Sequence, residues 1–208
     1  MAASGVRFVS IRATEGTDYK DPTFPANWAG AHAAGLVRAA YHFARPASPA
    51  AAQADALVDA AAAAGGFAAN SSTLQFMLDL EDADGLAPAG VWAWVQAFMA
   101  QLRARTGRPG IIYVGYYFWR DSVGNPLDNL DAPLWIASYT PKPSVPSAWP
   151  FWTFWRALLG RQLAAGRAPT AASHPLHTWH CILAQSTTTM ARSQASLAMW
   201  TWTSLRGA

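Results

Sequence analysis

The sequence predicts an α/β protein whose largely parallel sheet is arranged as an incomplete β/α barrel. The first observation is that apolar runs of strand length alternate with helical segments of roughly ten to eighteen residues, as in βα units. The second is that 208 residues with 52% hydrophobic content can bury one substantial core. Strand patterns end before residue 156 and number six, fewer than the eight or so that close a barrel.

Each predicted element has a local reason. The helices have proline near their start and glycine after their end, as with Pro49 and Gly65, or Pro88 and Gly107. The strands are short runs rich in β-branched and aromatic residues, each bounded by turn residues. We therefore expect strands at 8–14, 36–43, 74–81, 111–118, 134–139 and 151–155, and helices at 25–34, 49–64 and 88–105.

The charge distribution divides the chain into two parts. Residues 1–155 carry ten Lys and Arg against all twelve Asp and Glu, whereas residues 156–208 carry five Arg and no acid. We expect a barrel domain over 1–155 and an atypical basic tail over 156–208, either disordered or out of frame. Five Arg spread over such a tail are too dispersed for a nucleic-acid site, so we predict no nucleic-acid partner.

Composition excludes several other classes. No apolar run approaches the roughly 20 residues of a transmembrane helix, and the first residues do not form a secretory signal. Cys181 is the only cysteine, so an intrachain disulfide is excluded. His174, His177 and His180 stand near it, but their spacing does not let three ligands converge from one helix, and Pro175 opposes a helix there. We predict no metal site.

The strongest chemical signal is the run Gln75-Phe-Met-Leu-Asp-Leu-Glu81. Side chains alternate along a strand, so Asp79 and Glu81 are expected on the same face near its C-terminal end, where barrel enzymes keep their chemistry. A carboxylate pair in such a place is the usual apparatus of glycoside hydrolysis. The alternative is a solvated acidic turn, because Asp82 and Asp84 follow at once.

The stretch from Gly5 to Trp155 resembles the family 25 glycoside hydrolases, the Chalaropsis-type lysozymes. The matching motifs occur in the family's order: Phe8-Val-Ser-Ile-Arg-Ala-Thr-Glu-Gly-Thr17, Asp21-Pro-Thr-Phe24, Asn27-Trp-Ala-Gly-Ala31, Gly35-Leu36, Ala40-Tyr-His-Phe-Ala-Arg-Pro46, Met77-Leu-Asp-Leu-Glu81, Thr106-Gly-Arg-Pro109, Ile112-Tyr113, Gly115-Tyr-Tyr-Phe-Trp119, Leu134-Trp-Ile-Ala137 and Trp152-Thr-Phe-Trp155. The resemblance implies an irregular TIM-like β/α barrel that hydrolyses the β-1,4 bond between N-acetylmuramic acid and N-acetylglucosamine in peptidoglycan. It implies no cofactor, a monomer and an extracellular site of action without membrane attachment.

The resemblance also assigns roles to residues. Glu81 matches the general acid, which partial burial and a neighbouring negative charge would keep protonated. Asp79 would supply that charge, and would stabilise the oxocarbenium-like centre or orient the substrate N-acetyl group. Hydrolysis with inversion at the anomeric carbon and hydrolysis with substrate-assisted retention are both compatible with the sequence. Glu15 is a candidate polar residue of the mouth and Arg45 a candidate structural residue. Four aromatic residues are the expected sugar platforms, with core packing as the alternative for each: Tyr41, Tyr113, Trp135 and Tyr139.

Two departures from the family pattern concern the ends of the chain. A first strand with an Asp-Val-Ser-like motif and a last strand reading roughly Gly-x-Val-Asp-x-Asn are both absent. However, Met199-Trp-Thr-Trp-Thr203 must be encoded ATG TGG ACN TGG ACN, and its third base opens a frame reading Val-Asp-x-Asp. We therefore expect a chain truncated at its N-terminus and frameshifted after about residue 155; a genuine divergent tail is the alternative. Sequencing the coding DNA across codons 150–208 would decide.

Three functional interpretations follow. The first is a peptidoglycan muramidase, an enzyme that the two departures could leave inactive. The second is a non-catalytic barrel that binds cell-wall glycan through its aromatic residues. The third is an unstable fragment without function.

Overall fold

The computed structural model describes residues 8–66, 73–140 and 142–156 of the chain. Expectations about residues 156–208, including the His174, His177, His180 and Cys181 group, concern residues that lie almost wholly outside this part. The described elements, in chain order, are β1 (Phe8–Glu15), β2 (Tyr19–Lys20), α1 (Phe24–Ala33), β3 (Val37–Phe43), α2 (Ala50–Ala63), β4 (Met77–Leu80), α3 (Pro88–Thr106), β5 (Ile111–Gly115), α4 (Tyr116–Ser122), β6 (Leu134–Ala137) and β7 (Phe154–Arg156).

The strands form one twisted sheet in the order β2-β1-β3-β4-β5-β6-β7. Every neighbouring pair is parallel except β1 with the two-residue β2. The predicted α/β class with a largely parallel sheet is therefore confirmed, and within the described residues the sheet is open. Because all the parallel strands run the same way, their C-terminal ends meet along one edge, where ligands bind in such sheets.

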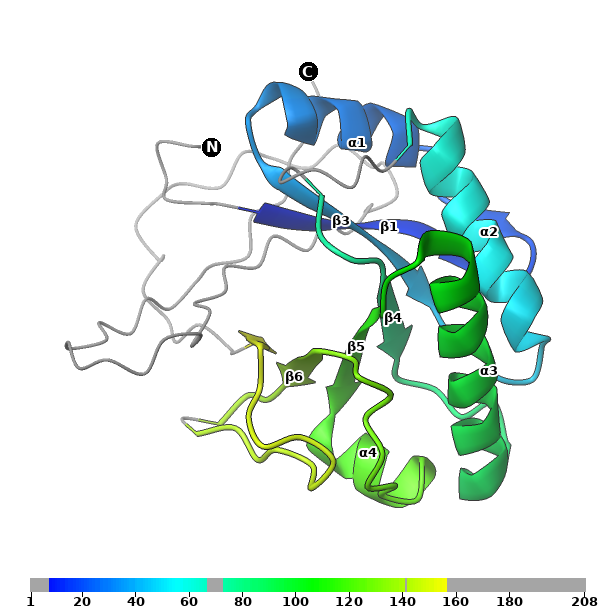
Figure 1. Ribbon diagram of the computed structural model, residues 1–208, viewed down its shortest axis with the longest axis vertical. Coiled ribbons are helices and arrows are strands. Elements are labelled where there is room, and N and C mark those ends of the chain that lie inside the picture. Colours follow the sequence, from blue (N-terminus) through cyan, green and yellow to red (C-terminus); the bar gives the residue numbers. More distant parts are fainter. Residues whose placement is uncertain (1–7, 67–72, 141, 157–208) are drawn as a thin grey trace, which may run out of the picture.

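Helices α1, α2 and α3 lie along one face of the sheet (Figure 1). They cover every second side chain of the strands, the ones that point toward the helices. Examples are Ile11, Leu78 and Ile112, which are at most 2% exposed. The helical side of this core is made mainly of apolar side chains from α1, α2 and α3: Phe24, Trp28, Ala54, Leu57, Val91, Val95, Phe98 and Leu102. The strand side chains between them point away from these helices and form a second apolar cluster.

Strand β1 contains a bulge at Ala13. Arg12 pairs with Tyr41 and Thr14 with His42, so Ala13 has no partner of its own on β3. The extra residue shifts the alternation, and the side chains of Thr14 and Glu15 point to the face opposite to the one that an unbroken strand would give them. Thr14 consequently reaches the helix-covered face, and Glu15 reaches the face that carries the second cluster.

The observed elements differ from the predicted ones mainly in one place. The prediction extended the fourth parallel strand to Phe118, but β5 ends at Gly115 and α4 begins at Tyr116. The run Tyr116-Tyr-Phe-Trp119 is rich in residues with strand propensity, yet Trp119 is fully buried and Tyr117 exposed, which suits a helix packed on one side. The β4, β6 and β7 strands are also shorter than predicted, and β2 was not predicted.

Candidate active site

A single row of residues crosses the face of the sheet opposite the helices, from the C-terminal ends of β1 and β3 to the first residue of β7. The strand registers pair Glu15 with Phe43, Phe43 with Asp79, and Asp79 with Tyr113. The row continues from Tyr113 to Trp135 and on to Phe154. Directly paired residues of neighbouring strands present their side chains to the same face. Two carboxylates, Glu15 and Asp79, thus flank Phe43, and aromatic residues fill the rest of the row.

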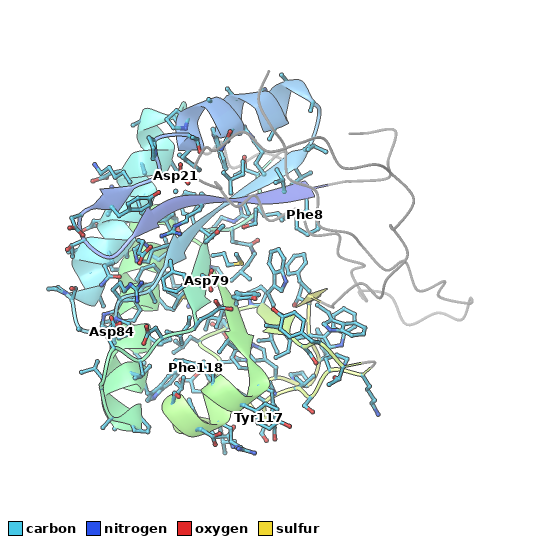
Figure 2. The ribbon with its side chains drawn as sticks, turned by 180° about the vertical axis from the view of Figure 1, so that it is seen from behind. Phe8, Asp21, Asp79, Asp84, Tyr117 and Phe118 are labelled. Atoms are coloured by element: carbon cyan, nitrogen blue, oxygen red, sulfur yellow. The ribbon has the colours of Figure 1, made fainter. Side chains whose placement is uncertain are left out.

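Asp79 occupies the centre of this row. Its side chain is 6% exposed, and its carbonyl accepts a 2.9 Å hydrogen bond from the Ala44 N–H group, which extends the pairing of β3 with β4. Figure 2 shows Asp79 in the middle of the sheet and Asp84 toward the side of the molecule. A carboxylate at this place is fixed by the strand on which it stands, as a catalytic or electrostatic group requires.

Glu81 is the first residue beyond β4 and is exposed. From the sequence we expected Glu81 at the end of the strand and partly buried; the expectation of burial is wrong. The strand stops at Leu80 because its pairing with β5 ends at Val114, and β3 has already ended opposite Asp79. An exposed carboxyl group at the open edge can meet a substrate directly, whereas Asp79 lies below it in the sheet.

The surface beside Glu81 is made of small residues. Continuing the register of β4 and β5 by one residue sets Glu81 opposite Gly115, which pairs in turn with Ala137. A Cβ atom added to Gly115 would find nothing closer than the Ala137 carbonyl oxygen at 4.0 Å. The positions beside Glu81 therefore carry less side-chain bulk than the row below, which is filled with aromatic rings.

Three of the four expected sugar platforms are buried. Tyr41, Tyr113 and Trp135 are 4%, 2% and 0% exposed, and Trp135 packs edge-on to Tyr113 with ring centroids 6.1 Å apart. Their ring faces are covered, so core packing, the alternative given above, describes them in this structure. The physical reason is that these side chains pack against one another, and Phe8 and Phe154 pack against Trp135 on the same face of the sheet. Tyr139 is 51% exposed, and its ring is accessible just beyond β6.

Sequence reasoning missed a cluster of charges at the ends of β1, β3 and β4. The Arg45 guanidinium donates hydrogen bonds to Glu15, Asp82 and Asp84, and Arg12 forms a second ion pair with Glu15. Asp82 and Asp84 were considered only as a possible solvated turn, the alternative to a catalytic pair. The available signal was that both lie within three residues of Glu81.

A buried polar chain lies beneath this cluster. Gln53 Oε1 accepts the Arg45 N–H at 3.1 Å, so it also accepts from His42 Nε2 at 2.7 Å, and His42 Nδ1 then accepts from the Thr14 hydroxyl at 2.8 Å. His42 is therefore held as its neutral Nε2–H tautomer. Burial lowers the pKa of His42 to about 4; the Arg12 charge adds to this effect, and the Gln53 hydrogen bond opposes it.

Two further findings concern the described residues only. Among residues 8–66, 73–140 and 142–156, no three His, Cys, Asp or Glu side chains come together in a way that would hold a metal ion. Across the same residues, every helix is too short or too polar to cross a membrane.

Comparison with known sequences identifies relatives over most of the chain. Residues 1–156 match the family described as Glycosyl hydrolases family 25. Lysozyme M1 of Streptomyces globisporus is 40% identical over 164 residues, covering 74% of this chain and 54% of that protein. An N,O-diacetylmuramidase of a Chalaropsis species is 37% identical over 167 residues, covering 74% and 78%. The chain thus spans about half the length of Lysozyme M1 and a larger part of the fungal enzyme.

Solved structures give the same result. A muramidase of Trichobolus zukalii is 38% identical, with a TM-score of 0.70 over 75% of this chain and 78% of that one. A bacterial lysozyme of Streptomyces coelicolor is also 38% identical, with a TM-score of 0.69 over 75% of each chain. The fold is therefore the TIM-like fold of these proteins.

Proposed function

Since the chain belongs to glycosyl hydrolases family 25, we propose that it is a muramidase, which hydrolyses the β-1,4 bond between N-acetylmuramic acid and N-acetylglucosamine in peptidoglycan. The observation that carries this proposal is the placement of Asp79 and Glu81. They lie at the C-terminal end of a central parallel strand, beside small residues, within the part of the chain that matches the family.

Glu81 acts as the general acid. Its carboxyl group donates a proton to the glycosidic oxygen while the bond from that oxygen to the anomeric carbon breaks, so the leaving sugar departs as a neutral alcohol. Positive charge then develops at the anomeric carbon and the ring oxygen. A water molecule, attacking directly or after the substrate's own N-acetyl oxygen, completes the hydrolysis and releases a proton.

Asp79 stabilises the positive charge that develops on the sugar. A carboxylate held by the strand in a largely buried position interacts with this charge more strongly than a solvated one, because water screens it less. Tyr139 supplies an exposed aromatic face at the same edge of the sheet, suited to stacking on a sugar ring.

The proposed partner is the glycan strand of the cell wall, and the proposed place of action is outside the cell. A protein of this kind binds an extended polymer along the sheet edge and needs no second subunit, so we propose that it acts as a monomer. A non-catalytic wall-binding barrel is less well supported, because the relatives carry lysozyme and muramidase names and both Asp79 and Glu81 are present in this chain.

The decisive experiment is analysis of the bond that is cut. The protein is incubated with purified peptidoglycan, the new reducing ends are reduced with borohydride, and the fragments are identified by mass spectrometry. A muramidase leaves reduced N-acetylmuramic acid, whereas a glucosaminidase leaves reduced N-acetylglucosamine. Binding to the walls without new reducing ends would favour the non-catalytic alternative.

Replacing Asp79 by Asn is expected to lower the rate of cell-wall clearing at least about tenfold. The isosteric amide keeps the shape of the side chain but carries no negative charge, so the positive charge that develops on the sugar loses its partner. Initial rates of clearing at the pH optimum, together with a thermal melt, measure the effect. Clearing at the wild-type rate would exclude Asp79 from this electrostatic role.

A further inference from the structure

Arg45 joins three carboxylates that come from different parts of the chain. Its Nε donates to Glu15 Oε1 at 2.7 Å, and its Nη1 lies 3.1 Å from Asp82 Oδ2 and 3.5 Å from Asp84 Oδ1. These residues stand 30, 37 and 39 positions away in the sequence. The guanidinium thus links the end of β1 to the segment that follows β4.

The backbone of Arg45 is held by the Gln53 side chain of α2. The Gln53 side chain accepts from the Arg45 N–H at 3.1 Å and donates to the Arg45 carbonyl at 2.7 Å. Gln53 is fully buried and is fixed in turn by His42. Both polar groups of the Arg45 backbone are therefore held by one amide, and the direction in which the side chain leaves the β3–α2 loop is set by α2.

The side chain of Arg45 is 38% exposed and is flanked on two sides. Its Cζ lies 4.9 Å from the centre of the Phe43 ring. On the other side, a Cβ atom added to Gly16 would meet Arg45 Cγ at 3.4 Å, and Gly16 has a φ of +57°. A residue with a side chain at position 16 would be strained there and would crowd the arginine. These two contacts, together with the hydrogen bonds to Glu15 and Asp82, limit the rotamers that Arg45 can adopt.

The segment that Arg45 holds begins immediately after Glu81. Asp84 has a φ of +46°, an uncommon conformation for a residue with a side chain. Its carboxylate takes hydrogen bonds from Arg45 and from the Ala47 N–H, and its own N–H donates to Asp82 Oδ1 at 2.9 Å. The Arg45 charge thus compensates two carboxylates that would otherwise repel each other within three residues of Glu81.

We propose that Arg45 is a positioning residue for the reaction: it holds Asp82 and Asp84, and through them fixes the place of the Glu81 carboxyl group at the sheet edge. The role of Arg45 in the reaction rests on the proposed function, whereas its hold on Asp82 and Asp84 does not. The competing interpretation is an ordinary surface ion-pair cluster, which contributes little to the free energy of unfolding and does not fix the position of Glu81. The two interpretations differ in what happens to the segment after β4 when the guanidinium is removed.

The test compares three variants with the wild-type chain. Arg45→Gln removes the charge and the bridging, Arg45→Lys keeps the charge but has no fork to reach several carboxylates, and Arg103→Gln is the matched control. Arg103 forms an exposed ion pair with Asp131 at 3.4 Å, outside the residues of the site. Two readouts are taken on each protein: amide hydrogen exchange, and kcat and KM on purified glycan strands.

Hydrogen exchange reports on positioning without any need for activity. In Arg45→Gln, the amides of Asp84 and Leu86, bonded to Asp82 and to the Ala83 carbonyl, should exchange at least about tenfold faster. The amides of β4 should keep their wild-type rates, as should all these amides in Arg103→Gln. Unchanged exchange at Asp84 and Leu86 in Arg45→Gln would overturn the proposal, whether or not the protein is lytic.

The kinetic readout tests the catalytic consequence. We expect Arg45→Gln to lower kcat roughly tenfold to a hundredfold with KM changed less than about threefold, and Arg45→Lys to recover part of kcat. A rise in KM with an unchanged kcat would overturn the proposal. So would a fall in kcat that comes with a lower melting temperature and is equally large in Arg103→Gln. If the wild-type chain cuts no glycan, the proposed function fails, and the exchange rates still decide whether Arg45 positions this segment.

Discussion

Replacing Glu81 by Gln is expected to lower the rate of cell-wall clearing at least about a hundredfold. The amide is nearly the same shape as the carboxyl group, but it cannot donate the proton that the leaving oxygen needs. Because Glu81 is exposed and follows the end of β4, the change should leave the melting temperature within about 2 °C of the wild-type value. Turbidity of a cell-wall suspension and a thermal melt measure the two quantities.

A matched control for this variant is Asp59→Asn. Asp59 lies on α2, where its carboxylate forms an ion pair with Arg105 of α3 at 2.7 Å, on the helical layer rather than at the sheet edge. The same change from acid to amide there should leave the clearing rate unaltered. Clearing by the Glu81→Gln protein at the wild-type rate would exclude Glu81 from the role of general acid.

Lowering the pH from 7 to 4 is expected to remove about 3 kcal/mol from the free energy of unfolding through His42 alone. Its pKa is about 4 in the folded chain and about 6.5 in the unfolded chain, so the unfolded chain binds the proton first. The stability therefore begins to fall as the pH drops below about 6.5, and this loss is complete once the pH is below about 4. Urea titrations at several pH values in this window measure the slope.

The control for this prediction is His42→Gln, which cannot be protonated. It should be less stable at pH 7, because it cannot reproduce the contacts with Thr14 and Gln53 or the stacking of the ring on Phe98 at 5.3 Å. Its stability should depend less on pH between 4 and 6.5 than that of the wild type. An equal slope in both proteins would assign the acid sensitivity to other groups.

Local signals were sufficient to predict most elements of this fold. Helix α3 lies almost where Pro88 and Gly107 placed it, since a proline at the start and a glycine with φ of +70° at the end act through their own backbone. The helix α4 was missed because Tyr116 to Trp119 have strand propensity, and their burial on one side depends on distant neighbours such as Trp149, 4.7 Å from Trp119.

The candidate site was predictable only in part. Asp79 and Glu81 stood out because a strand and two carboxylates are adjacent in the sequence. The partners of Arg45 could not be found in this way, because each lies 30 or more residues away. The resemblance also predicted Tyr113 and Trp135 as sugar platforms, yet could not show that their rings are covered, since exposure depends on which side chains pack against them in the folded chain.

The bulge at Ala13 has a consequence for the register of β1. If Ala13 rather than Thr14 paired with His42, β1 would alternate without a break, and Thr14 would turn away from His42 and Glu15 away from Arg45 at the same time. Deletion of Ala13 should instead leave both contacts in place, because Arg12 and Thr14 would then be consecutive residues opposite Tyr41 and His42. The buried histidine and the arginine cluster therefore depend on one and the same register of this strand.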